Sequence, residues 1–138
     1  MKKVFYENWL AKVLLCMSSC HTITVGPFVL SKRKEERLTQ ESRNHECTHA
    51  RQWAEMALAC GLFVWVLMLL FDWSSWWLIL SGFAFYLWYG VEWLIKFVRL
   101  CDAGEAYRAI SFEREAYGNE GDANYLENSS YFAWLKYL

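Results

Sequence analysis

The stretch ALACGLFVWVLMLLF (57–71), then Asp72, then WSSWWLILSGFAFYLWYGV (73–91) decides the fold of this chain. Asp72 is the only charged residue in it. A helix needs roughly 20 apolar residues to cross the hydrocarbon core of a bilayer, with about 17 as the lower limit. The second run is long enough alone, and the residues from Trp53 on can extend the first, provided that Glu55 faces protein or headgroups. Because Asp72 and the serines that follow it are turn-forming residues, the sequence predicts an integral-membrane helical hairpin with two spans.

Aromatic side chains gather at the ends of the two apolar runs, as they do at membrane–water interfaces. They are Trp73, Trp76 and Trp77 at the turn and Trp88, Tyr89 and Trp93 at the opposite end. The alternative is a buried αα-hairpin of a soluble protein. The other parts of a 138-residue chain are too short to cover two such helices, so we favour the membrane hairpin.

The composition also limits the partners. The chain is 56% hydrophobic and 19% aromatic, yet 21% of its residues are charged, and nearly all charges lie in residues 1–55 and 92–128. A net charge of −1 lacks the basic surface that nucleic-acid binding requires. Five cysteines without a repeated spacing argue against a disulfide framework. We therefore predict the lipid bilayer as a partner and no nucleic acid, and leave homo-oligomerisation open.

The distribution of lysine and arginine predicts an orientation in the membrane. Nine of the 14 lie at or before Arg51, five lie beyond the second apolar run, and the turn has none. Cytoplasmic segments carry the excess of positive charge in membrane proteins. We therefore expect a protein of the cell or inner membrane with both termini, and any site outside the hairpin, in the cytoplasm.

Residues 1–20 permit two interpretations. Apolar residues recur at helical spacing, which predicts an amphipathic helix at the membrane interface: Trp9, Leu10, Val13, Leu14 and Met17. A basic start and small residues before Cys20 also resemble a lipoprotein signal. Because Glu7 and Lys12 interrupt the apolar part of that signal, we favour the amphipathic helix.

The segment HTITVGPFVLSK, residues 21–32, has strand-forming residues on both sides of Gly26 and Pro27. Proline cannot donate to a β-ladder, so this segment predicts an edge strand or a bent pair of short strands. Zinc peptidases often bind substrate along an edge strand, but an ordinary structural strand fits the sequence equally well.

The motif NHECTHARQ, residues 44–52, carries the chemistry. His45 and His49 are four residues apart, so on a helix both imidazoles project from one face and can reach one Zn²⁺. Glu46 lies roughly 100° around the helix, where its carboxylate can take a proton from a metal-bound water. Thr39 or Ser42 can cap this helix. The alternative is a solvated helix with incidental histidines.

Two histidines require a third protein ligand to complete such a site. His21 is one candidate. The acidic cluster ISFEREAYGNE, residues 110–120, is a better one, because the hairpin returns it to the same membrane face as the histidines.

HExxH followed at a distance by a helix with Glu-x-x-Ala resembles the gluzincin metallopeptidases. Within them it is similar to the membrane-embedded CAAX-prenyl-protease and heat-shock-protease group and to the minigluzincins, whose second motif is ExxAD or ExEAD. The resemblance implies Glu113 as the third ligand and Ala116 as the small packing residue. Tyr117 replaces the aspartate that supports a histidine in the family, so Tyr117, Glu120 or Asp122 is expected in that supporting role. The resemblance covers the two motifs and their helices.

Residues near the two motifs have less specific predictions. Glu115 is the alternative ligand to Glu113. Tyr107 and Arg108 are candidates to stabilise a developing oxyanion. Arg51 and Gln52 are expected either to orient groups around the ligands or to face lipid headgroups, and Glu92 is expected at the membrane interface.

Two imidazoles and one carboxylate with an open position are typical of catalytic zinc, although iron accepts the same set. The HExxH helix and Glu46 favour hydrolysis, so we predict zinc-dependent cleavage of a membrane-associated peptide or protein. Two alternatives stay open: a non-catalytic membrane protein stapled by zinc, and a small interaction or regulatory subunit with a vestigial motif.

These predictions describe a single mainly α domain. Its expected order is an amphipathic helix (1–20), a strand region (21–32), the HExxH helix continuing into the first span (39–71), the second span (73–98), a third-ligand helix (105–120) and an interfacial C-terminal segment (125–138).

Overall fold

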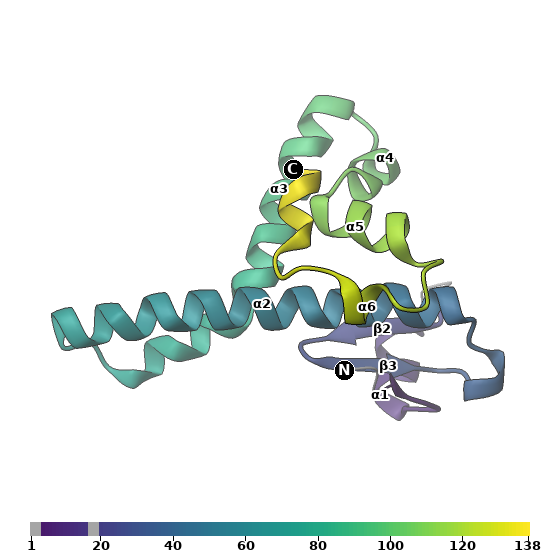
Figure 1. Cartoon of the computed structure of the whole chain (residues 1–138), viewed down its shortest axis with the longest axis horizontal. Helices are drawn as coiled ribbons and strands as arrows, with labels where there is room; N and C mark the ends of the chain where they lie inside the picture. The colour runs from purple at the N-terminus through teal and green to yellow at the C-terminus, as the bar shows by residue number, and fades with distance from the viewer. Residues whose placement is uncertain (1–3, 17–19) are drawn as a thin grey trace.

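One long helix, α2 (Gln40–Phe71), passes through the centre of the structure, and the other elements lie along it (Figure 1). The computed structural model describes residues 4–16 and 20–138. Thr39 caps the start of α2 by accepting a hydrogen bond from the Ser42 amide at 3.2 Å. The 32 residues of α2 extend for about 48 Å and end at Asp72, which adopts the left-handed conformation with φ of 55°. A single helix therefore carries both motif histidines and the first apolar run.

A small sheet lies against the first half of α2. It contains β1 (Val4–Phe5), β2 (Thr22–Val25) and β3 (Phe28–Ser31) in the order β1-β3-β2. Strand β1 is parallel to β3, and β2 is antiparallel to it. Gly26 has φ of 60°, which suits the tight turn that it makes with Pro27. Of the two arrangements expected for this segment, the chain forms the pair of short strands, with β2 at the edge.

The N-terminal segment differs from the helix expected over residues 1–20. Helix α1 (Trp9–Leu14) covers only part of it, and the extended backbone of β1 instead pairs with β3. Ala11 and Leu15 are buried, while the apolar residues Trp9, Leu10, Val13 and Leu14 are exposed. Met17, also expected on its apolar face, lies outside the described residues.

After Asp72 the chain reverses into a 3-10 helix, η2 (Ser75–Phe83), which packs back along α2, and then continues as α3 (Ala84–Leu100). Trp53 fixes the junction by donating from Nε1 to the Gly82 carbonyl at 2.9 Å. Helix α3 leaves α2 at a wide angle (Figure 1). The expected second span is therefore two segments with a bend instead of one straight helix.

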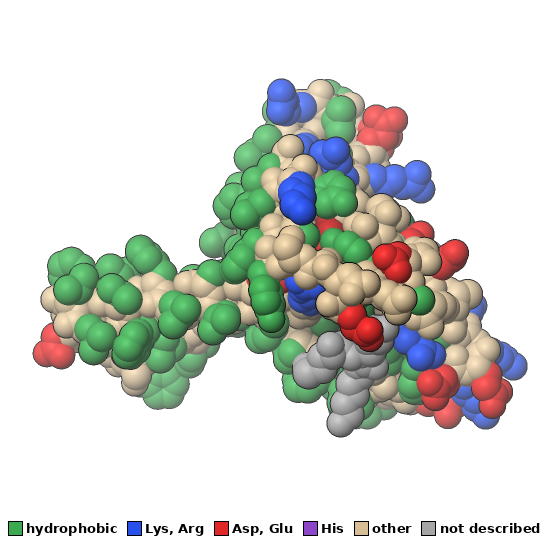
Figure 2. Space-filling view, viewed as in Figure 1, with side chains coloured by type: hydrophobic (Ala, Val, Ile, Leu, Met, Phe, Trp, Pro, Cys, Tyr) green, Lys and Arg blue, Asp and Glu red, His purple; other side chains and the backbone are tan. Residues whose placement is uncertain are grey.

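The apolar side chains of the hairpin are uncovered. Gln40–Phe71 and Ser75–Leu100 are both long and apolar enough to cross a membrane. Figure 2 shows hydrophobic side chains over the projecting arm of α2 and η2 and along one side of α3. Glu55, at the base of the arm, faces protein: it accepts hydrogen bonds from Arg51 and from the Phe132 amide, each at 2.9 Å.

The acidic segment forms two helices, α4 (Ala103–Arg108) and α5 (Ser111–Asn119), instead of the single helix expected over residues 105–120. Glu92 of α3 explains where α5 begins. Its carboxylate accepts hydrogen bonds from the amide and hydroxyl of Ser111 at 2.9 and 2.7 Å. Glu92 is only 7% exposed, so the expectation that it faces the membrane interface is wrong. It serves as a capping group that α5 lacks in its own sequence.

The C-terminal segment contains α6 (Tyr125–Asn128) and a 3-10 helix, η3 (Ala133–Tyr137). Trp134 is 4% exposed and packs in a core cluster with Phe85, Ile110 and Phe112. The segment was expected to lie on the membrane or to close the site. Its buried residues support α5, the helix that carries the predicted third ligand, while Tyr131, Leu135 and Leu138 are exposed.

Candidate metal centre

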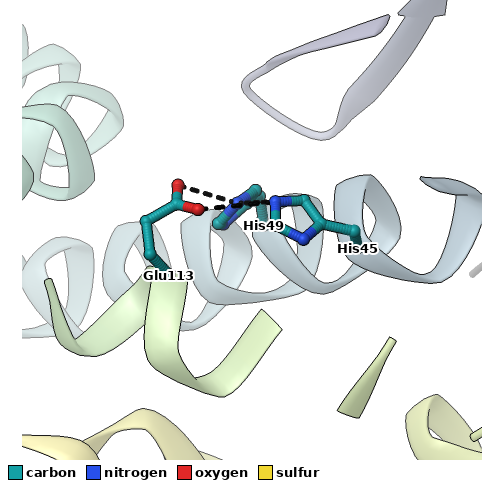
Figure 3. Close-up of side chains that lie close together, drawn as sticks. All are labelled: His45, His49 and Glu113. Atoms are coloured by element: carbon teal, nitrogen blue, oxygen red, sulfur yellow. Dashed lines mark hydrogen bonds and ion pairs between the residues drawn. The ribbon is translucent and has the colours of Figure 1, made fainter. Parts of the chain in front are cut away.

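His45, His49 and Glu113 come together where α5 lies against α2 (Figure 3). The two Nε2 atoms are 3.1 Å apart. Glu113 places Oε1 3.1 Å from His49 Nε2 and Oε2 3.5 Å from His45 Nε2. His49 and Glu113 are buried, and 12% of the His45 side chain is exposed. These three are the residues that the motifs predict as ligands.

The spacing of these donor atoms fits a single metal ion. Ligands at about 2.0–2.1 Å from a tetrahedral zinc ion lie roughly 3.3 Å from one another. The two Nε2 atoms are 3.1 Å apart and each lies 3.1 or 3.5 Å from a different Glu113 oxygen, and with one ligand atom from each residue the three atoms lie within 4.8 Å of one another. Among the described residues, Glu113 Oε2 is also a buried oxygen without a hydrogen-bond partner. The group could therefore hold a metal ion.

Both imidazoles are oriented from their outer nitrogens. His45 Nδ1 lies 3.2 Å from Glu120 Oε2, and His49 Nδ1 lies 2.8 Å from Gln52 Oε1. Because both partners are acceptors, each Nδ1 donates, and Nε2 is the nitrogen of each ring that would bind a metal ion after losing any proton that it carries. Glu120 thus takes the supporting role for which Tyr117, Glu120 and Asp122 were candidates. Tyr117 instead packs edge-on against the His45 ring, with centroids 4.5 Å apart.

Gln52 connects this centre to the opposite face of α5. Its Nε2 donates to Glu115 Oε2 at 2.8 Å and to the Phe112 carbonyl at 3.1 Å. Tyr125 donates to Glu115 Oε1 at 2.7 Å. Both oxygens of Glu115 therefore accept hydrogen bonds from Gln52 and Tyr125, and neither contacts the histidines as part of the ligand group. Residues two apart on a helix point to nearly opposite faces, so Glu113 and Glu115 cannot exchange roles.

Hydrogen bonds hold the Glu113 carboxylate in place. Tyr89 of α3 donates to its Oε1 at 2.8 Å. Burial alone would raise the pKa of Glu113, but the neighbouring imidazoles of His45 and His49 outweigh burial and hold that pKa below its ordinary value. The carboxyl group is therefore ionised at neutral pH, as a metal ligand must be.

Glu46 lies beside the cluster and not within it. Thr22 donates to its Oε1 at 2.9 Å, and Thr24 lies 2.7 Å from its Oε2. The two threonines alternate along β2, so both project from the same face of the edge strand. They hold the Glu46 carboxylate between β2 and the two histidines. The alternation of Thr22 and Thr24 is visible in the sequence. Only the packing of β2 against α2 shows that both hydroxyls bond the Glu46 carboxylate.

A pocket of about 400 Å³ opens beside the cluster. His45, Glu46, His49 and Glu113 line it together with Tyr107 of α4. Burial and, next, the negative charge of Glu113 raise the pKa of Tyr107, so its hydroxyl stays protonated at neutral pH.

Two further candidates lie elsewhere. Arg108 lines a separate hollow with Arg114, Tyr117 and Tyr137, and not the pockets that contain His45. His21 lies 2.6 Å from an Arg33 nitrogen and does not belong to the ligand group. The structure thus brings together Glu113 with the two motif histidines, and leaves Arg108 and His21 outside.

Comparisons with protein-family models, with curated proteins and with solved structures find no match for this chain. Arguments about its function therefore rest on the two motifs and on the geometry described above.

Proposed function

We propose that this chain is a zinc-dependent metallopeptidase that cleaves a membrane-associated peptide or protein at the cytoplasmic membrane surface. The observation that carries the proposal is the group of His45, His49 and Glu113, whose ligand atoms, one from each residue, lie within 4.8 Å of one another. Iron accepts the same ligand set, but Glu46, held beside the ligands by two threonines, favours hydrolysis over oxygen chemistry.

Each residue has a role that its position supports. A zinc ion bound here would lower the pKa of a coordinated water and polarise the carbonyl of the scissile bond. Glu46 takes a proton from the attacking water and delivers it to the leaving amine, and Thr22 and Thr24 aim its carboxylate. Tyr107, protonated and lining the same pocket, replaces Arg108 as the donor proposed for the developing oxyanion.

The location of the site supports a substrate associated with the membrane. Helix α3 supplies Phe85, Tyr86 and Gly90 to the pocket beside the ligands, and the same helix belongs to the second candidate span. A substrate segment that emerges from a bilayer would therefore meet the cleft without leaving the surface. The positive-inside distribution of lysine and arginine favours the cytoplasmic side.

Metal analysis and a cleavage assay test the proposal. The protein purified in detergent should contain about one zinc ion per chain and should cleave an unstructured peptide until a chelator is added. Glu46→Gln should retain the zinc and lower kcat by roughly 10²- to 10⁴-fold, the usual contribution of a general acid–base group. Glu41→Gln, the same change at an exposed position of α2, should leave both properties intact.

The outcome separates the candidate functions. Zinc without any metal-dependent cleavage would identify the centre as a staple between α2 and α5. A chain that binds no zinc would instead support an interaction or regulatory subunit with a vestigial motif. Cleavage that survives both the chelator and Glu46→Gln would rule out the proposed mechanism.

A further inference from the structure

Two hollows lie on either side of the predicted general base. One has a volume of about 400 Å³ and the other of about 270 Å³. They share part of their lining: Cys20, Thr22, His45, Glu46 and Tyr107. A chain that places its scissile bond beside His45 and Glu46 therefore extends into a different hollow in each direction.

The larger hollow is mainly apolar. Besides the shared residues and the metal ligands, it is lined by Leu15, Ile23, Thr24, Phe85, Tyr86, Tyr89 and Gly90. Phe85 and Tyr86 belong to α3, whose outer side is covered by exposed apolar side chains (Figure 2). Pockets of this kind bind hydrophobic side chains because burial removes apolar surface from water.

The smaller hollow is polar, and two arginines supply its positive charge. His21, Arg33 and Arg37 line it, together with Leu38, Thr39, Ser42, Tyr117 and Glu120. The Arg33 guanidinium donates to His21 Nε2 and, in the described part of the chain, neither Arg33 nor Arg37 has a carboxylate within ion-pair distance. Glu120, one of two acids in this hollow, accepts a hydrogen bond from His45. The two arginines therefore present positive charge that is not held in an ion pair with a described carboxylate.

We propose that the cleft recognises a peptide with apolar residues on one side of the scissile bond and acidic residues on the other. The apolar side enters the hollow next to α3, and the acidic side lies against Arg33 and Arg37. This inference rests on the proposed peptidase function and adds the substrate class to it. A juxtamembrane segment in which a hydrophobic stretch gives way to Asp and Glu has this pattern.

Binding of two labelled peptides tests the inference. They share one apolar half and differ only in the other half, which is rich in Glu in one peptide and in Lys in the other. Fluorescence anisotropy with the zinc-loaded Glu46→Gln protein in neutral detergent gives the dissociation constant of each peptide without turnover. The acidic peptide should bind at least about fivefold more tightly, and added salt should reduce the difference, as expected for exposed charge pairs.

Charge reversal identifies the residues responsible. Adding Arg33→Glu and Arg37→Glu should invert the preference, and adding Arg33→Gln and Arg37→Gln, which introduces no new charge, should abolish it. Arg99→Glu is the matched control, because Arg99 is exposed on α3 nine residues, or about 13 Å, beyond Gly90. Retained zinc shows that each variant is folded.

Equal binding of the two peptides, or a preference that persists in both double variants, would overturn the inference. Failure of the peptidase proposal gives a different result. A charge preference without cleavage by the unmutated protein would leave the recognition site standing and refute the hydrolysis. Metal-dependent cleavage without a charge preference would support the hydrolysis and refute the recognition site.

Discussion

The side-chain oxygen of Gln52 lies 2.8 Å from Nδ1 of His49, one turn earlier on the same helix. The amide nitrogen of Gln52 is simultaneously held by Glu115 and by the Phe112 carbonyl. A predicted ligand on α2 is therefore oriented by contacts with α5, the helix that carries Glu113. The packing of α5 against α2 and the orientation of His49 therefore both depend on the buried side-chain amide of Gln52.

Replacing Gln52 should weaken metal binding without removing a ligand. Gln52→Met preserves the approximate volume but leaves His49 Nδ1 and Glu115 without their partner. Loss of an outer hydrogen bond to a ligating histidine typically lowers metal affinity by about 10- to 100-fold. Titration of zinc against a chromophoric chelator measures the change. An unaltered affinity would show that Gln52 does not orient His49.

The two glutamates of FEREAY should respond differently to the same substitution. Glu113→Gln removes the predicted carboxylate ligand from the centre. It should lower zinc affinity by more than the roughly 100-fold expected for a supporting residue. Glu115→Gln keeps an acceptor for Gln52 and Tyr125 and should have a much smaller effect on zinc. The same titration compares both variants. A larger loss for Glu115→Gln would assign the third ligand to the alternative position.

Glu92 should contribute to stability and to metal binding through α5. Glu92→Ala leaves the Ser111 amide and hydroxyl buried without an acceptor, at a cost of about 1–3 kcal/mol. Because Ser111 begins the helix that carries Glu113, the variant should show a lower Tm in detergent and a weaker zinc affinity. Glu105→Ala removes an exposed carboxylate from the neighbouring helix α4 and is the control. Equal Tm values for the two variants would contradict the capping role.

Cysteine labelling tests the proposed membrane orientation. Cys16 and Cys101 are exposed and should lie in the cytoplasm, so a membrane-impermeant maleimide should not label intact cells that express the chain. Ser74→Cys places a thiol in the turn between the apolar segments and should be labelled from outside. Labelling of the unmodified chain on intact cells would contradict the cytoplasmic placement of these residues. An unlabelled Ser74→Cys would contradict a hairpin that crosses the membrane.

Local patterns were enough to predict the ligands and the long helix. The four-residue spacing of His45 and His49, the cap at Thr39 and the absence of proline from α2 all depend on neighbours in sequence. Glu113 was selected among the acids of residues 110–120 because the resemblance to the gluzincin glutamate motif implied it, and the structure brings it beside the two histidines. The mainly helical fold and the small sheet are confirmed by the structure.

Long-range contacts account for what the sequence did not predict. Glu92 ends an apolar run, where a charged residue normally marks the interface, and only its partner Ser111 explains its burial. Strand β1 is too short to show a periodic pattern and exists because β3 offers a free edge. The bend between η2 and α3 is likewise fixed from outside the segment, by Trp53 on α2.

The unbroken course of α2 has a consequence for where a substrate would be cut. His49 and Ala57, the start of the apolar run, are separated by eight residues, or about 12 Å of rigid helix. With the arm embedded in a bilayer, this rigid helix would set the height of the candidate metal centre above the lipid. Inserting a single residue between them would raise that height by about 1.5 Å and rotate the ligands by roughly 100° relative to the anchor.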